Sequence, residues 1–478
     1  GGCCNEPIQP STVLVMVLLS SLSTILLLPP LLFFSATSDG FLTNNNYNKR
    51  MTTTMSRPPR RLTIDKRLAA EGEALPVPPG MDGVHVGVPF DSTALYEMEQ
   101  LNVSNVYVMA NKSSKPMVEH FVKTLKEMGF LAAPINCDVS MGGAEDGLLK
   151  ACNEAVSVNA DCVLTIGGGA VQDAGKFVRL WLSVATAAAD EIDGEKKAAT
   201  VQRILAAQNK DPMPPLPPQI CCPNSFAMAE LTHVAGLVTR ENVKSGASHP
   251  NMMPTVVIFD TTLSRGLPDW VRFGTALRGI EHAIGAICHP KATDDIRARA
   301  LQGLELVNKG LKGMVQNPDS EEAQVNCYLG GWMAIRALNT GCYPSIAHFI
   351  QNQYSARFNV HQGACSGILS ARILHHHREE SSLYQKSISQ ALGREDNGDR
   401  EQQSLPSAPQ LVSDLVVTLP GVAKDHADAK VDEEMLRDFA EYMYNQYGEK
   451  LNKLSPKSFC NAEEFFEMLT LPIASLAE

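Results

Sequence analysis

The sequence predicts an α/β N-terminal part built on a parallel sheet, followed by an all-α C-terminal part. Between Val84 and Asp260, short β-branched runs such as NVYVM and CVLTIG alternate with longer amphipathic stretches, which is typical of parallel strands joined by helices. From about Leu263 the β-branched runs stop and long helical patterns take over, as in Glu321 to Leu338. We therefore place the α/β domain at residues 81–262 and the helical domain at residues 263–478.

The composition fits a globular protein with a large core. Hydrophobic residues make up 44% of the chain and charged residues 19%. The 41 basic residues against 52 acidic ones give a net charge of -11, which repels phosphate backbones. No basic patch offsets this charge, so we expect no nucleic-acid partner. A polar, proline-containing stretch near residues 390–410 predicts a surface insertion in the helical part.

Residues 1–80 are interpreted as a targeting presequence and disordered linker, and we expect the fold to begin near Val84. The run from Thr12 to Phe34 is uncharged and apolar, and the stretch from Phe41 to Arg67 is rich in Asn, Thr, Ser and basic residues. This combination resembles the bipartite presequences of plastid proteins in secondary endosymbiotic algae. We expect a plastid or another organelle, and a mature chain without stable membrane association. Two alternatives stay open, namely a later start with a cytoplasmic product and a retained anchor.

A glycine-rich turn is the most informative segment of the α/β part. The strand that ends at Ile166 runs into Gly167, Gly168 and Gly169, and a helical pattern with Asp173 follows directly. Residues without a Cβ let a phosphate approach the backbone, and the free N–H groups and positive dipole of the helix stabilise it. A tight connection without any ligand explains the same pattern, so the turn alone does not decide between them.

Two segments resemble a known family. Ile166 to Lys176 resembles the Gly-Gly-Gly-Ser-x-x-Asp-x-x-Lys signature of iron-type alcohol dehydrogenases, glycerol dehydrogenases and maleylacetate reductases, with Ala170 in place of the Ser. Pro223 to Thr232 is similar to the maleylacetate reductase pattern Pro-Thr-Thr-Tyr-Ala-Gly-Ser-Glu-x-Thr. The resemblance implies the architecture shared with dehydroquinate synthase, in which a dinucleotide-binding α/β domain with a parallel sheet precedes an all-α domain.

The resemblance also implies that NADH or NADPH binds at the glycine turn. Besides the three glycines and Asp173, it assigns Asn224 and Ser225 to the cofactor, in the place of two threonines in the family pattern. Asn111 falls where many relatives carry an Asp that binds the adenosine ribose, and a neutral residue there allows NADPH. The same asparagine is equally explained as a helix N-cap, so the choice of cofactor stays open.

In the resembled family a divalent metal, iron or zinc, is held between the domains by an Asp and three His. Only His282 and His361 match these ligands here. Gly274 to Ala286 is similar to the branch pattern Gly-x-Asn-Ala-x-x-His-Ala-x-Glu-Ala, but Arg278 stands where an Asn or carboxylate is expected. Pro344 replaces another histidine. Because a guanidinium repels a metal ion, we expect the catalytic metal to be absent.

Arg278, His282 and His348 are the candidate catalytic residues. Arg278, with Lys244 as a second cation, could supply the positive charge that a metal offers to a carbonyl or carboxylate. His282 or His348 could donate the proton. Glu281 is the neighbouring carboxylate, but its place on the helix should point it about 100° away from His282. His348 is equally explained as a core histidine, and Arg278 as a salt-bridged surface residue.

The sequence therefore predicts an NAD(P)-dependent reductase similar to maleylacetate reductase, which transfers hydride to a small carbonyl or enoyl acid. A catalytically degenerate dinucleotide-binding pseudoenzyme and a metal-dependent alcohol dehydrogenase are the alternatives. We expect a small-molecule substrate, and a homodimer is an open alternative to a monomer. The pseudoenzyme is favoured by substitutions in the family motifs, which occur at Ala170, Met228, Arg278, Gly285 and Pro344.

Overall fold

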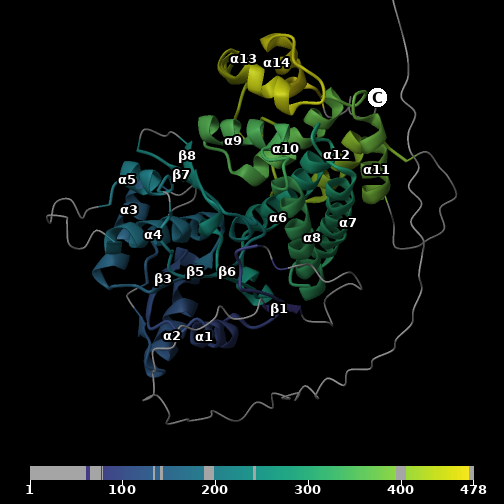
Figure 1. Ribbon diagram of the computed structural model, residues 1–478. Helices are drawn as coiled ribbons and strands as arrows, with labels where there is room; N and C mark the ends of the chain where they lie inside the picture. Colours follow the sequence, from purple (N-terminus) through teal and green to yellow (C-terminus); the bar gives the residue numbers. More distant parts are fainter. Residues whose placement is uncertain are drawn as a thin grey trace, which may run out of the picture. The chain divides into compact units, whose positions relative to one another are not determined.

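Seven described strands form one parallel sheet in the computed structural model, in the order β1-β2-β9-β6-β5-β3-β4 (Figure 1). The strands of this sheet are β1 (Arg61–Ile64), β2 (Gly83–Val86), β3 (Asn105–Ala110), β4 (Leu131–Ala132), β5 (Cys162–Gly167), β6 (Gln219–Pro223) and β9 (Val256–Phe259). A separate antiparallel hairpin is made by β7 (Val234–Val238) and β8 (Lys244–Ser248). Every pairing in the large sheet is parallel, which confirms the predicted α/β class.

The structure describes residues 61–64, 77, 79–132, 135–139, 144–187, 199–210, 212–240, 244–393 and 405–472. Apart from β1 and residues 77, 79 and 80, the predicted presequence and linker lie outside the described residues. β1 pairs with β2 from Arg61 opposite Gly83, so the expected start of the fold near Val84 is too late by one strand. The sequence did not predict this strand because a short edge strand pairs through its backbone on one side only, and basic residues are common in such strands.

Helices cover both faces of the sheet. Helices α1 (Phe90–Gln100) and α2 (Lys115–Glu127) cover one face, and α3 (Glu145–Ser157), α4 (Gly169–Ala187) and α5 (Val201–Ala207) cover part of the other. Successive side chains of a strand point to opposite faces. In β3, Val108 therefore packs with α1 and α2, whereas Tyr107 packs with α3 and α4.

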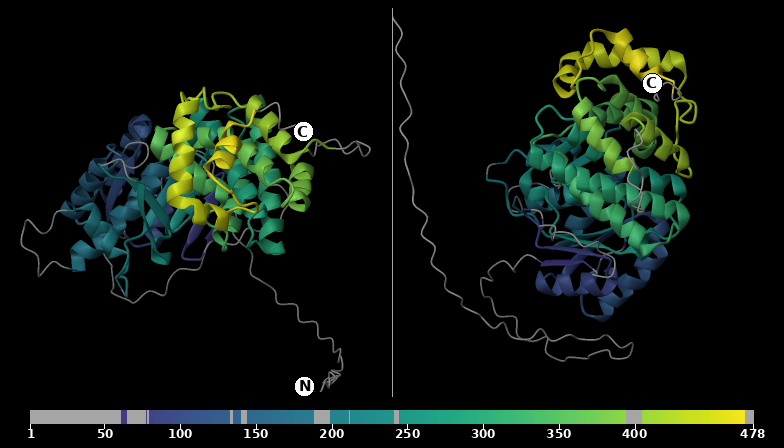
Figure 2. Two further views of the ribbon diagram at one scale, coloured as in Figure 1. Left: turned by 90° about the horizontal axis from the view of Figure 1, so that it is seen from above. Right: turned by 90° about the vertical axis from the view of Figure 1, so that its right-hand side faces the viewer.

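From Asp269 onward the described chain contains helices and no strands, as the green and yellow segments of Figure 2 show. These helices are α6 (Asp269–Ile287), α7 (Asp294–Gln316), α8 (Glu321–Asn339), α9 (Ile346–Phe358), α10 (Gln362–His376), α11 (Ser382–Gly393), α12 (Ala408–Thr418), α13 (Glu433–Leu454) and α14 (Ala462–Thr470). This confirms the predicted all-α part. Of the insertion expected near residues 390–410, the stretch 394–404 lies outside the described residues.

None of the helices in the described ranges combines the length and apolarity that crossing a bilayer requires.

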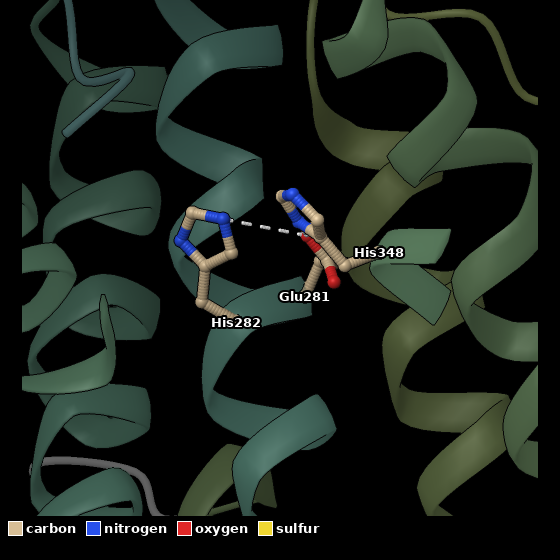
Figure 3. A group of neighbouring side chains, drawn as sticks. All are labelled: Glu281, His282 and His348. Carbon is tan, nitrogen blue, oxygen red and sulfur yellow. Dashed lines mark hydrogen bonds and ion pairs between the residues drawn. The ribbon is translucent and has the colours of Figure 1, made fainter. Parts of the chain in front are cut away.

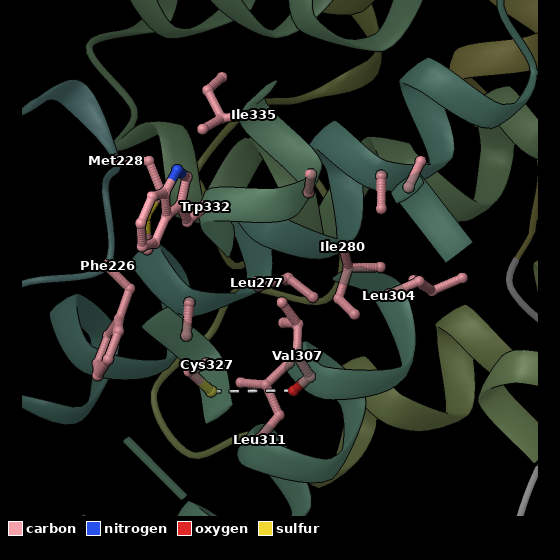
Figure 4. Packing of buried hydrophobic residues seen from close by; sticks show 14 of the residues in the cluster. Phe226, Met228, Leu277, Ile280, Leu304, Val307, Leu311, Cys327, Trp332 and Ile335 are labelled. Carbon is pink, nitrogen blue, oxygen red and sulfur yellow. Dashed lines mark hydrogen bonds between the residues drawn. The ribbon is translucent and has the colours of Figure 1, made fainter. Parts of the chain in front are cut away.

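One hydrophobic core joins the sheet to the helical part (Figure 4). Phe226, from the loop after β6, belongs to the same buried cluster as Leu277 of α6 and Trp332 of α8. At the end of β9, Phe259 stacks on Tyr328 of α8 with ring centroids 4.0 Å apart. Buried aromatic contacts of this kind stabilise an interface strongly. They fix α6 and α8 next to the carboxyl ends of β6 and β9.

The close approach of α7 and α8 depends on a glycine. A Cβ at Gly310 would lie 2.6 Å from the carbonyl oxygen of Ala323 and from Sγ of Cys327, so the helices would have to move apart. We predict that Gly310→Ala lowers the stability of the protein by about 1–3 kcal/mol, measured as a lower midpoint of thermal unfolding. Gly448→Ala in α13 is the matched control, because its Cβ would meet only the Tyr444 ring at 3.6 Å or more. Equal midpoints for the two variants would contradict the prediction.

Candidate functional site

The carboxyl ends of three neighbouring strands bring the predicted cofactor residues together. β3, β5 and β6 are adjacent, and they are followed in turn by Asn111, by residues 167–169, and by Asn224 and Ser225. The backbone N–H of Asn224 donates to the Gly167 carbonyl over 3.1 Å. The side-chain amide of Asn224 donates to Oδ1 of Asn111 over 3.2 Å. Parallel α/β sheets bind their ligands at this edge.

Neighbouring side chains leave little room for a Cβ at the glycines of the turn. A Cβ at Gly167 would lie 2.9 Å from Oδ1 of Asn111, and a Cβ at Gly168 would lie 3.3 Å from Oγ of Ser225. Because α4 begins at Gly169, the first N–H groups of this helix have no partner within the helix. Such N–H groups bind phosphate, so the turn fits the diphosphate of a dinucleotide.

Asn111 has features of both interpretations made from the sequence, namely the cofactor-binding residue and the helix N-cap. It is the N-cap residue of the short turn Lys112–Ser114, but its side chain makes no capping hydrogen bond. Instead, Oδ1 accepts hydrogen bonds from Ser114 Oγ over 3.0 Å and from Asn224 over 3.2 Å. The amide of Asn111 is therefore held against the glycine turn.

Asp173 holds the chain around the turn. Its Oδ1 lies 3.1 Å from Nζ of Lys176, and its Oδ2 accepts the backbone N–H of Gly236 over 3.0 Å. The buried ammonium of Lys176 also donates to the carbonyl oxygens of Ala229 and Val234, over 2.7 and 2.6 Å. The Asp173–Lys176 pair thus fixes the segment that leads from the loop after β6, here called the cofactor loop because it carries the predicted cofactor residues Asn224 and Ser225, into the β7–β8 hairpin. We therefore assign Asp173 a positioning role.

Helix α6 carries a buried arginine to the same region. Thr275 Oγ1 accepts the backbone N–H of Phe226 over 3.1 Å, which ties α6 to the loop after β6. One turn later, Arg278 is only 7% exposed, and its Nη2 lies 3.4 Å from Nε2 of His282. Within the described ranges Arg278 forms no ion pair. The interpretation of Arg278 as a salt-bridged surface residue is therefore wrong, because tight packing of α6 buries this face of the helix.

Glu281, His282 and His348 converge (Figure 3), and His282 is the member that lies beside this arginine. Oε2 of Glu281 lies 3.6 Å from Nε2 of His282 and 3.4 Å from Nδ1 of His348. Ser345 Oγ donates to the other carboxylate oxygen over 3.3 Å. The expectation that Glu281 points away from His282 is wrong. Their Cβ directions differ, but the longer glutamate side chain bends back toward the imidazole and meets His348, which α9 supplies.

Tyr343 extends this cluster to the protein surface, and the sequence analysis missed it. Its hydroxyl lies 3.4 Å from Nε2 of His348, and the residue is 42% exposed. Burial raises the pKa of Tyr343, while the charges of Arg278 and Asp173 act on it with opposite signs. The available signal in the sequence was weak, namely a tyrosine shortly before the capping Ser345 of α9.

His361 lies outside the group of mutually close ligand atoms that Glu281, His282 and His348 form. Its Nδ1 accepts the backbone N–H of Gly363 over 3.1 Å and so caps α10. Burial, and after it the charge of Arg278, lowers the pKa of His361 to about 4.

Arg278 is the buried cation of this site, and Glu281 is its buried anion. Burial lowers the pKa of His282, and Arg278 adds to this, so the imidazole is neutral. Burial alone would raise the pKa of Glu281, but with His282 neutral, the hydrogen bond from His348 and the charge of Arg278 still lower it and keep the carboxylate ionised. Burial of its ammonium group lowers the pKa of Lys244, on which Asp173 and Arg278 act with opposite signs. The charges of Arg278 and Lys244 favour a small anionic ligand.

Comparison with known proteins agrees with the fold. Residues 92–261 match the family described as iron-containing alcohol dehydrogenase, and residues 274–462 match its C-terminal domain, described as Fe-containing alcohol dehydrogenase family, C-terminal. The chain belongs to the iron-containing alcohol dehydrogenase family. This confirms the resemblance found at the glycine turn.

Several relatives of this iron-containing alcohol dehydrogenase family member are maleylacetate reductases. The one from Rhizobium sp. strain MTP-10005 is 24% identical over 237 residues, which are 50% of this chain and 57% of that protein. Alcohol dehydrogenase 4 of Schizosaccharomyces pombe is 28% identical over 221 residues, 45% of this chain and 48% of that protein. These matches span about half the length of the curated relatives. The crystal structure of maleylacetate reductase from Agrobacterium tumefaciens shares the fold, with a TM-score of 0.63 and 18% identity over 88% of this chain and 97% of that chain.

The residues present do not fit the four-ligand metal site of this family. Arg278 and Pro344 occupy two of its positions. Ligand atoms of Glu281, His282 and His348 do lie within 4.8 Å of one another, and zinc binds such groups. However, Arg278 Nη2 lies 3.4 Å from Nε2 of His282, the nitrogen that faces the carboxylate. Repulsion between unit charges 4 Å apart is about 4 kcal/mol at an effective dielectric constant of ~20, and a divalent ion doubles it.

We predict that Arg278→Asp binds Zn²⁺ or Co²⁺ at least ~10-fold more tightly than the wild-type protein, because the repulsion is removed and a ligand is added. Competition with a chelating dye measures the affinity, and the visible spectrum of bound Co²⁺ reports the geometry. Arg278→Met removes the charge without adding a ligand, and it should fall between the two. Wild-type affinity equal to that of Arg278→Asp would contradict the argument.

A buried glutamate beside the cofactor loop predicts that the stability of the folded protein depends on pH. Tyr328 donates a hydrogen bond to Glu230 over 2.8 Å, and burial raises the pKa of this glutamate to about 7. Because the folded state then binds the proton more tightly than the unfolded chain, the stabilisation is fully present below the unfolded pKa of about 4.3 and is lost as the pH rises through 7. Glu230→Gln should therefore gain thermal stability relative to the wild type between pH 5 and pH 8.

The control for this prediction is the exposed Glu99→Gln in α1, whose difference from the wild type should not change with pH. A Glu230→Gln difference that is equally independent of pH would contradict it.

Proposed function

We propose that this family member is an NAD(P)H-dependent reductase that transfers hydride to a small carbonyl or enoyl acid. The observation that carries the proposal is the buried guanidinium of Arg278, which has no carboxylate partner among the described residues and lies one turn from the contact between α6 and the cofactor loop. Burying an unpaired charge is costly, and a bound anion offsets that cost. The names of the maleylacetate reductase relatives agree with an acidic substrate.

We assign the residues to two neighbouring regions, one for the dinucleotide and one for the substrate. The glycine turn, with Asn111, Asn224 and Ser225, would hold the dinucleotide, which supplies the hydride when bound. Arg278 and Lys244 would bind the substrate carboxylate or the oxygen on which charge develops, since guanidinium–carboxylate hydrogen bonds are strong and directional. The charge of Arg278 takes the role that a metal has in other family members, so we propose that turnover does not require a metal.

Titration of the purified full-length protein with NADH and NADPH, followed by assays of nucleotide oxidation with maleylacetate, keto acids and simple aldehydes, tests this proposal. We expect nucleotide binding, turnover of the acids, and activity that survives a chelator. Arg278→Met should raise KM for the acids by about 30-fold or more, as when one partner of a buried charge pair is removed, and should affect neutral aldehydes less.

Other results would favour the two alternatives. Nucleotide binding without oxidation of either nucleotide by any substrate would favour the pseudoenzyme. Activity that a chelator abolishes, and that stoichiometric iron or zinc restores, would favour a metal-dependent alcohol dehydrogenase.

A further inference from the structure

We propose that Tyr343, His348 and Glu281 form a proton relay, in which the hydroxyl of Tyr343 protonates the substrate. The proposal rests on the reductase function above and identifies the group that completes the reaction. A carbonyl that accepts a hydride becomes an alkoxide, and an enoyl acid becomes an enolate. Either product needs a proton from a group within hydrogen-bond reach.

The three side chains are joined in sequence from the surface to the interior. The Tyr343 hydroxyl lies 3.4 Å from Nε2 of His348, and Nδ1 of His348 lies 3.4 Å from Oε2 of Glu281. Because the carboxylate accepts a hydrogen bond from Nδ1, it sets the tautomer of the imidazole and leaves Nε2 to exchange a proton with the tyrosine. Ser345, which caps α9, holds the second carboxylate oxygen of Glu281.

Exposure decides which of these groups meets the substrate. Tyr343 is 42% exposed, whereas His348 is 7% and Glu281 1% exposed. The hydroxyl lies 3.4 Å from Nε2 of His348, and the charges of Arg278, Asp173 and Glu281 also act on it. Tyr343 is therefore the member of the relay that a substrate at the protein surface can reach.

The two histidines named from the sequence are less suited to direct donation. Nε2 of His282 faces the guanidinium of Arg278 over 3.4 Å, and its Nδ1 is buried without a hydrogen-bond partner. Both nitrogens of His348 are engaged, one by Tyr343 and one by Glu281. His348 can pass a proton to the tyrosine, but the tyrosine lies between it and the surface.

The step balances in atoms and electrons. The carbonyl carbon accepts a hydride, with its electron pair, from the reduced nicotinamide nucleotide, and the π electrons move to the carbonyl oxygen. This oxygen takes the proton of Tyr343 as the phenolic O–H bond breaks. In the neutral Nδ1–H tautomer Nε2 of His348 carries no hydrogen, so Nε2 first takes a proton from solvent, and Glu281 stabilises the resulting imidazolium. Nε2 then passes this proton to the phenolate, which returns His348 to its neutral Nδ1–H form. The net reaction consumes one proton and oxidises one nucleotide.

The arrangement can be tested without turnover. In the full-length protein labelled with ¹⁵N-histidine, NMR should show His348 with its hydrogen on Nδ1, and loss of this signal in His348→Gln assigns it. Glu281→Gln should shift the tautomer toward Nε2–H, whereas Tyr343→Phe should leave the hydrogen on Nδ1. A wild-type His348 with its hydrogen on Nε2, or a tautomer that Glu281→Gln does not change, would overturn the relay.

Kinetics test the role of the tyrosine. Tyr343→Phe should lower kcat by about 100-fold or more, the usual contribution of a general acid, and should leave KM and nucleotide affinity nearly unchanged. His348→Gln should add little to the effect of Tyr343→Phe in the double variant, because the two residues act as one unit. Tyr96→Phe, at an exposed position of α1, is the matched control and should retain wild-type rates.

The failures can be told apart. If the wild-type protein reduces acids and Tyr343→Phe keeps its kcat, the relay is overturned while the reductase function stands. If the wild-type protein binds nucleotide and reduces none of the acids, the proposed function is overturned, and the relay with it.

Discussion

The site depends on the positive charge of Arg278, which α6 buries without a carboxylate partner among the described residues. After burial itself, this charge lowers the pKa of His361 and contributes to the low pKa of His282. It also helps to keep Glu281 ionised against the effect of burial. A buried cation of this kind is unfavourable unless opposite charge lies near it. The ionised Glu281 supplies part of that charge, and an anionic ligand would supply the rest.

The family pattern has a Glu one helical turn beyond the position of Glu281 on α6. That pattern has a Glu three residues after the first histidine, where this chain has Gly285. A Cβ at Gly285 would lie 2.5 Å from Oγ of Ser345, so no side chain fits there. Glu281 lies four residues earlier and therefore on the same face of α6. It accepts a hydrogen bond from the same Ser345 over 3.3 Å.

Local pattern predicted which residues gather at the glycine turn, but it did not predict how Glu281 and Tyr343 meet His348. The glycine turn could be predicted because strand, turn and helix are written in consecutive residues, and parallel strands bring Asn111 and Asn224 to the same sheet edge. The reach of Glu281 and the place of Tyr343 depend on how α9 packs against α6, which no periodicity encodes. β1 was missed because its pairing with β2, the next strand along the chain, and not its composition, makes it part of the sheet.

Substitution of a family residue does not by itself indicate a decayed site, as Met228 shows. It replaces a glycine of the family pattern and keeps the left-handed conformation that glycine favours, with φ of 58°. That conformation costs a non-glycine residue roughly 1–2 kcal/mol. The side chain is 1% exposed and lies where a Cβ at Gly331 of α8 would come within 2.6 Å of it. Burying a methionine contributes roughly 1.5–3 kcal/mol, which offsets the strain. The turn at Met228 thus keeps the conformation of the family glycine, and burial of the methionine side chain offsets the strain. The altered sequence of this turn does not indicate a loss of catalysis.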